Sequence, residues 1–392
     1  MKNAITVLHL GDLHLDSPFS SMSSEAQSRA NTELRDVFSR AMRFAAHEKA
    51  DIVLLAGDLF DREYYSPATV ALLVSEMRSL PDCRFVISPG NHDPLTPHSP
   101  YKSLSFPPNC HIFDKKEVSV FSFPEINTDV YGYAFQAPEY TGNPLSGFKV
   151  SRPERFNLLC AHTELGAVAF STYAPISNDS LLISGIDYAA LGHIHTSESI
   201  LRAKRADGEC FAAYSGCIAG RDYSEHGEKG GILVKLSVCD GKKLIRPQRI
   251  TFCPWVYRDL TVDVSGARNS DELTERLLSA IPKERQELRL RARVRIRGRV
   301  PEDAVNLTFL RNQLSALGDI KLIDETLREE SFDQLKNDYT LKGAFYRALS
   351  EQLASDDPTV ARRARLALKM GLHALEGGNP ADAYALFDRD ID

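Results

Sequence analysis

The chain has 392 residues, of which 43% are hydrophobic and 26% are charged, and its formal net charge is −6. This length predicts two or three domains, and the acidic balance excludes a global attraction to nucleic acid, so any such binding needs a local basic patch. No apolar run approaches the ~20 residues of a membrane-spanning helix, no signal peptide precedes the first strand, and the cysteines form no Cys-x-x-Cys pair, so we expect a cytoplasmic protein without membrane contact.

Predicted strands and helices alternate over the first 90 residues. Apolar runs at 5–10, 51–55 and 85–87 predict strands, and helices are expected over 32–49 and from Ser66 to about Leu80. This β-α-β-α-β order implies a largely parallel sheet. Later apolar runs, at 111–134, 156–160, 188–191, 211–218 and 230–238, predict a second set of strands. Residues 1–252 are therefore predicted as an α/β (α+β) domain, a two-layer mixed β-sandwich flanked by helices.

The remaining chain divides into two predicted regions after Pro254-Trp255. Strands and helices alternate again between 260 and 322, which predicts a small α/β domain at 256–328. Residues 329–392 are polar and helical, with helices expected over 332–354, 358–375 and 380–387. They have too few large apolar residues for a core of their own, so we expect them to pack on a neighbouring domain or a partner.

Five of the predicted strands end in side chains that can bind metal ions. Ligands of α/β sheets bind just beyond the carboxyl ends of the strands, so these side chains can meet at one site. A single Gly-Asp or Asn-His pair at a strand end is more often a simple turn, but five such ends in one chain favour a shared centre. The candidate ligands are Asp12, His14, Asp58, Asn91, His162, His193 and His195.

This donor set suits two divalent metal ions that share Asp58. It holds carboxylate, amide and imidazole groups without a thiolate, which favours manganese, with iron or zinc as alternatives, and disfavours calcium. Two metal ions about 3.5–4 Å apart are the arrangement that hydrolyses phosphoesters. We assign one ion to Asp12, His14, Asp58 and His195 and the other to Asp58, Asn91, His162 and His193.

His92 remains outside the ligand set and is the candidate catalytic acid. It follows Asn91 directly, so its imidazole can lie at the rim of the metal site and protonate the leaving oxygen. Asp61, three residues after Asp58, is the candidate partner that fixes the tautomer of that imidazole. Asp93 precedes a proline and is expected to be a turn residue.

A second pattern lies in the small domain, where arginines alternate with other residues from 289 to 299. Side chains two apart in a strand share a face, so the six guanidinium groups share one face at a spacing of about 6.6–6.8 Å. One interpretation is a patch that follows a DNA backbone. The alternative is a sheet face whose arginines pair with Glu and Asp of the local helices, which are acidic too. The residues are Arg289, Arg291, Arg293, Arg295, Arg297 and Arg299.

The ordered motifs resemble those of the calcineurin-like metallophosphoesterases. They stand here as Asp12-Leu-His14, Gly57-Asp58-Leu-Phe-Asp61, Gly90-Asn91-His92-Asp93, His162 and Gly192-His193-Ile-His195. Within that superfamily the chain is similar to the SbcD-type DNA-repair exonucleases, and to the YhaO-type branch that opens with HLDSPF, here at 14–19. The resemblance covers about 1–235, and residues 256–328 are similar to the capping domain of those nucleases. It implies a double β-sandwich, a manganese centre and the same roles for the ligands and His92.

Three functions follow as hypotheses. The first is a DNA phosphodiesterase, an exo- or endonuclease of DNA repair that acts with a coiled-coil ATPase of the SbcC type; the resemblance also implies a homodimer. The second is a phosphoesterase for small or cyclic nucleotides with the same metal centre. The third is a regulatory subunit that binds DNA or the ATPase and has vestigial hydrolysis, which the complete ligand set argues against.

Overall fold

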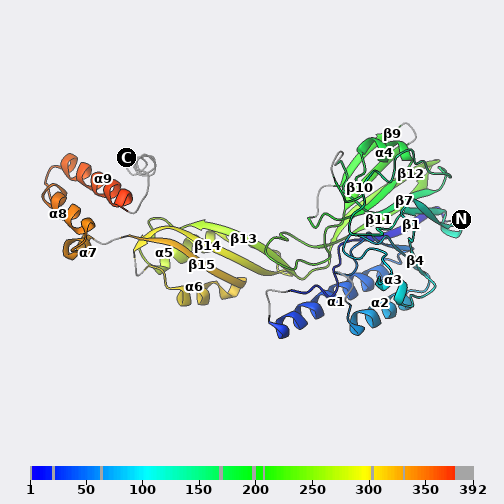
Figure 1. Ribbon diagram of the computed structural model, residues 1–392, viewed down its shortest axis with the longest axis horizontal. Coiled ribbons are helices and arrows are strands. Elements are labelled where there is room, and N and C mark those ends of the chain that lie inside the picture. Colours follow the sequence, from blue (N-terminus) through cyan, green and yellow to red (C-terminus); the bar gives the residue numbers. More distant parts are fainter. Residues whose placement is uncertain are drawn as a thin grey trace. The chain divides into compact units, whose positions relative to one another are not determined.

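The computed structural model describes residues 2–19, 23–61, 65–166, 171–196, 200–205, 208–301, 304–329 and 332–375. The chain forms two compact units (Figure 1). Unit 1 holds Met1–Asp259, Lys283–Arg293 and Leu317–Asp319, and unit 2 holds Leu260–Pro282, Val294–Ala316 and Ile320–Asp392. The domain limits at 252, 256 and 328 stay predictions. Within the described ranges, no helix combines the length and the apolar character needed to cross a membrane.

The first sheet of unit 1 is built around a parallel set of strands, as predicted. Its order is β12-β11-β1-β2-β3-β4, with β1 to β4 parallel and β11 antiparallel to both β1 and β12. The strands are β1 (Ala4–Leu10), β2 (Ile52–Leu55), β3 (Arg84–Ile87), β4 (Cys110–Ile112), β11 (Gly230–Cys239) and β12 (Lys242–Thr251).

The second sheet of unit 1 has the order β5-β6-β7-β8-β10-β9. Strands β6, β7, β8 and β10 are parallel, and the edge strands β5 and β9 are antiparallel to their neighbours. The strands are β5 (Ser119–Phe123), β6 (Thr128–Gly132), β7 (Phe156–His162), β8 (Tyr188–Gly192), β9 (Leu201–Arg205) and β10 (Gly208–Tyr214). Together the sheets confirm the predicted mixed α/β fold.

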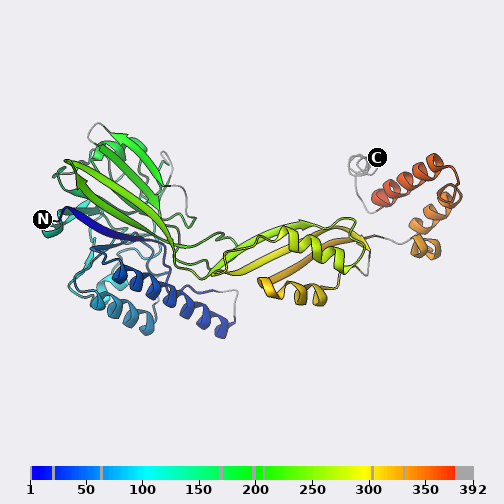
Figure 2. The same ribbon diagram turned by 180° about the vertical axis from the view of Figure 1, so that it is seen from behind.

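One hydrophobic core joins both sheets of unit 1. It contains Val53 and Phe85 of the first sheet together with Leu158 and Tyr188 of the second. Helices α1 (Ser24–His47) and α2 (Pro67–Ser79) lie side by side along the first sheet in both views (Figure 1, Figure 2). A second core lies on the other face of the second sheet, where α4 (Asn178–Ser184) packs. The short helix α3 spans Pro100–Ser103.

The first helix begins earlier than its apolar pattern predicts. The apolar pattern predicts a helix only from residue 32, whereas α1 begins at Ser24. The side chain of Ser23 accepts a hydrogen bond from the Ala26 amide, and Glu25 pairs with Arg29 one turn later at 2.7 Å. Serine is unfavourable inside a helix but is a good N-cap. The Ser23 cap and the Glu25–Arg29 pair therefore stabilise the extra turns, which have no apolar face.

A three-stranded sheet follows, in the order β13-β14-β15, and the division between the two units falls within its strands. The strands are β13 (Trp255–Asp263), β14 (Arg289–Pro301) and β15 (Gly318–Glu329). Helices α5 (Ser270–Ala280) and α6 (Leu307–Leu314) pack together in unit 2. The predicted alternation of strands and helices is therefore present.

The predicted helix over 332–354 is wrong as one element. The structure has α7 (Phe332–Asn337) and α8 (Leu341–Leu353) instead, followed by α9 (Pro358–Leu375). Asp338 accepts hydrogen bonds from the Thr340 amide at 2.7 Å and its hydroxyl at 2.6 Å, and this local turn separates α7 from α8. The helix expected over 380–387 lies outside the described residues.

Candidate metal centre

The candidate ligands of the centre all follow strands of the two sheets at their carboxyl ends. Asp12 and His14 follow β1, Asp58 follows β2, and Asn91 follows β3. His162 is the last residue of β7, and β8 leads directly into His193 and His195. The parallel pairing of β1 with β2, of β2 with β3, and of β7 with β8 places the ends of neighbouring strands together.

Three glycines of the motifs allow the loops to meet. A Cβ atom at Gly57 would lie 2.3 Å from Nδ1 of His162, and one at Gly90 would lie 2.2 Å from Oδ1 of Asp58. A Cβ atom at Gly192 would lie 1.8 Å from the Ala56 carbonyl oxygen. Any larger residue at these positions would push the ligands apart.

The backbone of the centre is held in an uncommon conformation. Asp12, His14 and Asp58 have φ values of 48°, 45° and 50°, and φ of His193 is 106°. Such left-handed conformations cost roughly 1–3 kcal/mol each for a non-glycine residue. The packed strands around the loops hold them in place and orient the side chains toward one another.

Asp58 lies between histidines of the two proposed ligand sets. Its Oδ2 atom is 3.7 Å from Nε2 of His14 and 3.5 Å from Nε2 of His162. On one side, Nε2 of His14 lies 3.0 Å from Nε2 of His195, and Oδ1 of Asp12 lies 3.9 Å from the latter atom. On the other side, Oδ1 of Asn91 lies 2.8 Å from Nε2 of His162. This is the arrangement expected of a carboxylate shared by two ions.

The protein alone does not balance the charges of this cluster, which fits a bound cation. Asp12, His14, Asp58 and His162 are almost fully buried. Burial raises the pKa of Asp12 to about 6 and that of Asp58 well above its usual value, while it lowers the pKa of His14 to about 3. Buried carboxylates beside unprotonated imidazoles are a typical environment of divalent metal ions. The residues present therefore fit a two-metal centre.

The contacts of His193 support a ligand role less directly than those of the other candidate ligands. Its ring lies 5.2 Å from the ring of His162 and 4.4 Å from that of Tyr173, centroid to centroid. Its backbone amide donates to both carboxylate oxygens of Asp12, at 3.0 and 3.1 Å. Within the described residues, the three groups of close donor atoms contain the other histidines of the site and not His193. Its role as a ligand stays a prediction.

His92 and Asp61 form the predicted pair at the rim of the centre. Nδ1 of His92 lies 2.9 Å from Oδ1 of Asp61, and 42% of the His92 side chain is exposed. The His92 amide also donates to Oδ1 of Asp58 at 2.9 Å, which fixes its loop against the centre. Burial alone would raise the pKa of Asp61, but the neighbouring side chains of His14, His92 and Ser17 outweigh it and hold that pKa below its usual range.

The sequence reasoning missed a buried Glu225–Arg221 pair beside His195. Oε1 of Glu225 accepts a hydrogen bond from Nδ1 of His195 at 2.9 Å, and Nη2 of Arg221 donates to the same oxygen at 2.6 Å. Arg221 also donates to Oγ of Ser17 at 3.2 Å, and Ser17 donates to Asp61 at 2.6 Å. Both residues belong to a polar loop without periodicity, so no spacing signal marked them.

Asp93 does more than the turn role predicted for it. Its carboxylate is buried and accepts hydrogen bonds from the amides of Leu59 and Gly90, at 2.7 and 2.8 Å. The Tyr101 hydroxyl donates to it at 2.5 Å. Asp93 therefore joins the loop that carries Asp58 to the loop that carries Asn91.

From Arg289 to Arg297 the arginines of β14 alternate with buried apolar residues, as predicted, whereas Gly298, between Arg297 and Arg299, is only partly buried. Among the described residues, acidic side chains pair with five of these arginines. Asp319 lies 2.9 Å from Arg289, Glu33 lies 2.8 Å from Arg291, and Glu325 lies 3.7 Å from Arg295 and 2.6 Å from Arg297; Arg293 pairs with Asp259. Arg299 lies in the same strand, after Gly298. These ion pairs favour a paired sheet face, but the partners lie on β13, β15 and α1 and not on the local helices that the alternative named. Contact with DNA stays a prediction.

Comparison with known proteins gives the class to which this geometry belongs. Residues 5–197 match the family described as calcineurin-like phosphoesterase. The chain is 31% identical over 287 residues to the "uncharacterized metallophosphoesterase YhaO" of Bacillus subtilis strain 168. The aligned region covers 70% of this chain and 66% of that protein. Over residues 5–197 the chain therefore belongs to the calcineurin-like metallophosphoesterases, a superfamily of metal-dependent phosphoester hydrolases with a dinuclear divalent metal centre.

Two further proteins are more distant. The chain is 26% identical over 205 residues to the "DNA double-strand break repair protein Mre11" of Saccharolobus solfataricus, covering 49% of this chain and 50% of that one. It thus spans about two thirds and one half of the lengths of the two curated relatives. Among solved structures, the purple acid phosphatase PPD1 from yellow lupin aligns with a TM-score of 0.35 and 11% identity, over 64% of this chain and 52% of that one.

Proposed function

We propose that the chain is a metal-dependent phosphodiesterase that hydrolyses DNA, a repair nuclease of the SbcD type. The observation that carries the proposal is the position of Asp58 between His14 and His162, with further donors on both sides. A relative named as a DNA double-strand break repair protein supports DNA as the substrate. Two divalent cations, with manganese as the expected metal, would neutralise charge on the phosphoryl oxygens and lower the pKa of the attacking water.

The protein's part in this reaction is to hold the cations and the substrate in place. Asp12, His14, Asp58 and His195 would bind one cation, and Asp58, Asn91, His162 and His193 the other. In the structure, Nδ1 of His162 donates to the Ala56 carbonyl at 3.1 Å, which fixes the ring so that Nε2 faces Asp58. Glu225 does the same for His195 through Nδ1. Such partners orient a ligand and raise its basicity.

His92 would supply the proton to the leaving oxygen. With Nδ1 held by Asp61, the Nε2 atom of its exposed ring is the nitrogen that can meet a substrate. The Asp61 carboxylate accepts from Nδ1 and so fixes the orientation of the ring. The ring lies 4.9 Å from that of His14, centroid to centroid, so it is close to the proposed cations without being one of their ligands.

We further propose a coiled-coil ATPase of the SbcC type as the partner, docked on the C-terminal helices, and a homodimer as the assembly. The helical region around α8 and α9 supports docking because it exposes large apolar side chains. Tyr339, Leu341, Val360 and Leu375 are 99%, 68%, 38% and 39% exposed. Apolar groups exposed on helices with few core residues are typical of an interaction surface.

An assay of the purified protein tests the function. Linear single- and double-stranded DNA and cyclic nucleotides are offered with manganese and with a chelator. We expect DNA hydrolysis with manganese, none with the chelator, and a loss of about 10²–10⁴-fold in turnover for His92→Ala at unchanged metal content. His98→Ala is the matched control, since His98 is an exposed histidine of the following loop. Hydrolysis of small esters alone would contradict the nuclease proposal.

A further inference from the structure

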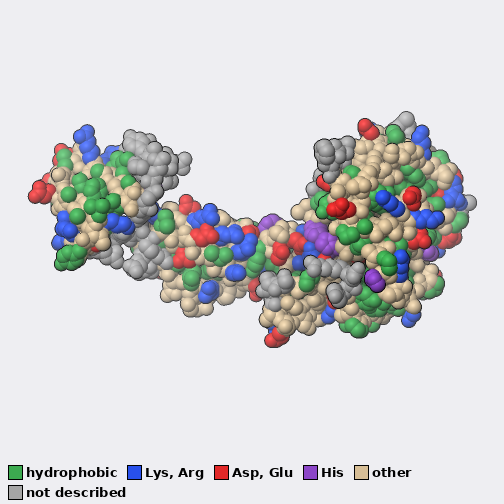
Figure 3. Space-filling model, in the orientation of Figure 1, with side chains coloured by type: hydrophobic (Ala, Val, Ile, Leu, Met, Phe, Trp, Pro, Cys, Tyr) green, Lys and Arg blue, Asp and Glu red, His purple; other side chains and the backbone are tan. Residues whose placement is uncertain are grey.

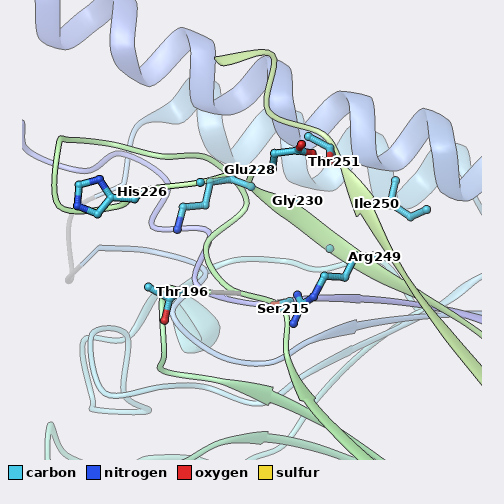
Figure 4. Close-up of a pocket in the computed structure, with 11 residues that line it drawn as sticks. Thr196, Ser215, His226, Glu228, Gly230, Arg249, Ile250 and Thr251 are labelled. Atoms are coloured by element: carbon cyan, nitrogen blue, oxygen red, sulfur yellow. Dashed lines mark hydrogen bonds between the residues drawn. The ribbon is translucent and has the colours of Figure 1, made fainter. Parts of the chain in front are cut away.

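A cavity of about 370 Å³ lies in unit 1, lined by residues from β11, β12 and the loops next to β8 and β10. Figure 4 shows Glu228 and Thr251 along one side of it in that view, and Thr196 and Ser215 along the other. None of the candidate metal ligands lines this cavity, although Thr196 directly follows His195. The cavity is therefore distinct from the metal centre but adjacent to it in the chain.

A buried lysine, Lys229, lines this cavity. Its side chain is among the largest that are fully buried, with 2% of the residue exposed. Its ammonium donates to the His195 carbonyl at 2.7 Å, and among the described residues it has no other hydrogen bond and no carboxylate within 4.0 Å. An ammonium carries three donors, and burying its charge without an anion is costly. Within the described part of the chain, no carboxylate neutralises this ammonium.

The other charged side chains of the lining are Arg249 and Glu228. Arg249 of β12 lines the cavity, and its guanidinium donates to the Tyr214 carbonyl at 3.3 Å. The carboxylate of Glu228 is engaged elsewhere, since it accepts hydrogen bonds from the Thr251 hydroxyl at 2.5 Å and from Arg285 at 2.7 Å. Hydroxyl groups of Thr196 and Ser215 add polar contacts.

We propose that this cavity binds the phosphate group of a nucleotide, with Lys229 and Arg249 as its cationic partners. A phosphate offers several acceptor oxygens, which match an ammonium and a planar guanidinium. The volume is at the small end of the ~300–1,000 Å³ typical of ligand pockets, so it has room for more than a bare phosphate ion. The phosphate can belong to a free mononucleotide or to the end of a nucleic-acid strand. This binding needs neither divalent metal nor hydrolysis.

Calorimetry with inorganic phosphate, in the presence of a chelator that keeps the metal centre empty, tests the proposal. We expect wild-type protein to bind phosphate and Lys229→Met and Arg249→Gln to bind it about tenfold or more weakly. Lys242→Met and Arg246→Gln, at exposed positions of β12, are the matched controls and should bind as wild type does. Circular dichroism and manganese binding report whether each variant is folded. If Lys229→Met does not fold, Arg249→Gln decides.

Competition then identifies the source of the phosphate. A mononucleotide that displaces inorganic phosphate indicates a free nucleotide, and an oligonucleotide that does so only with a terminal phosphate indicates a strand end. Absence of phosphate binding by wild-type protein, or equal binding by the folded variants, would overturn the proposal. Either result would leave the hydrolase proposal intact, because the DNA assay depends on manganese and His92.

Discussion

At the residue scale, Glu225 connects the candidate ligand His195 to the Asp61–His92 pair. It accepts from His195 on one side, and Arg221 continues from it through Ser17 to Asp61, the partner of His92. Burial alone would raise the pKa of Glu225, but His195 and Arg221 outweigh this effect and hold it well below its usual range. Glu225 is therefore a carboxylate under all ordinary conditions, and it can orient His195 without touching a substrate.

Replacing Glu225 by alanine should weaken metal binding. Without its acceptor, Nδ1 of His195 no longer fixes the ring, and loss of such a partner typically costs about 10–100-fold in metal affinity. The metal affinity of Glu225→Gln should lie between those of wild type and Glu225→Ala, because the glutamine amide oxygen still accepts from Nδ1 of His195. Manganese titration of each variant measures this. Glu228→Ala, on the same loop but bonded to Thr251 and Arg285, is the control. Equal affinities in folded variants would show that Glu225 has no positioning role.

Two glycines with similar backbones separate the effect of strain from that of crowding. Gly57 and Gly142 have φ values of 85° and 90°, but a Cβ atom at Gly57 would meet His162 at 2.3 Å, whereas one at Gly142 would meet nothing within 4 Å. We expect Gly142→Ala to cost about 1–2 kcal/mol of stability from its backbone alone. Gly57→Ala should cost more and also lose manganese binding. Retention of full manganese affinity by Gly57→Ala would contradict the tight packing of the loops.

At the element scale, strand β14 shows what an alternating pattern can and cannot establish. The alternation correctly predicted that the arginines share one face, since Leu290, Ala292, Val294 and Ile296 are buried on the other. It could not show what the arginines face. Arg291 illustrates the outcome, because its guanidinium lies 4.3 Å from the Trp255 ring and 2.8 Å from Glu33.

A salt titration decides whether this face binds DNA. The variant combines Arg293→Gln, Arg295→Gln and Arg297→Gln, and DNA affinity is measured over a range of salt concentrations. We expect an unchanged slope of log affinity against log salt, because acidic side chains already pair with these arginines. A fall of about one for each lost phosphate contact would establish the DNA interpretation instead. Arg311→Gln, on helix α6, measures the effect of removing one positive charge outside this strand.

The strands and their ends were predictable because each is marked by neighbouring residues. The apolar run before Gly57-Asp58 and the one before Gly90-Asn91 each specify a strand and the loop that follows it. Glu225 and Lys229 had no such mark. Their partner in both cases is His195, about 30 residues earlier in the chain, and only the pairing of β11 with β1 and the closure of the loop bring them together. Contacts of this kind depend on tertiary structure that local patterns do not encode.

At the scale of the whole molecule, unit 1 is not a continuous segment. Besides the first 259 residues it includes Lys283–Arg293 and Leu317–Asp319. The first of these segments is tied to the rest by the Arg289 amide, which donates to the Pro254 carbonyl at 2.8 Å, and by Arg291. The chain therefore leaves and re-enters unit 1 repeatedly.

Because unit 1 is discontinuous in the sequence, the end point of a truncated fragment determines whether unit 1 stays complete. A recombinant fragment that stops near residue 259 would lose the arginine that covers Trp255 and Glu33, and would expose that indole to solvent. Poor solubility or weak activity of such a fragment would reflect damage to the remaining part of unit 1. It would not show what the deleted region contributes to function. Fragments that end after residue 319 keep every segment of unit 1 and are therefore better suited for comparison with the full chain.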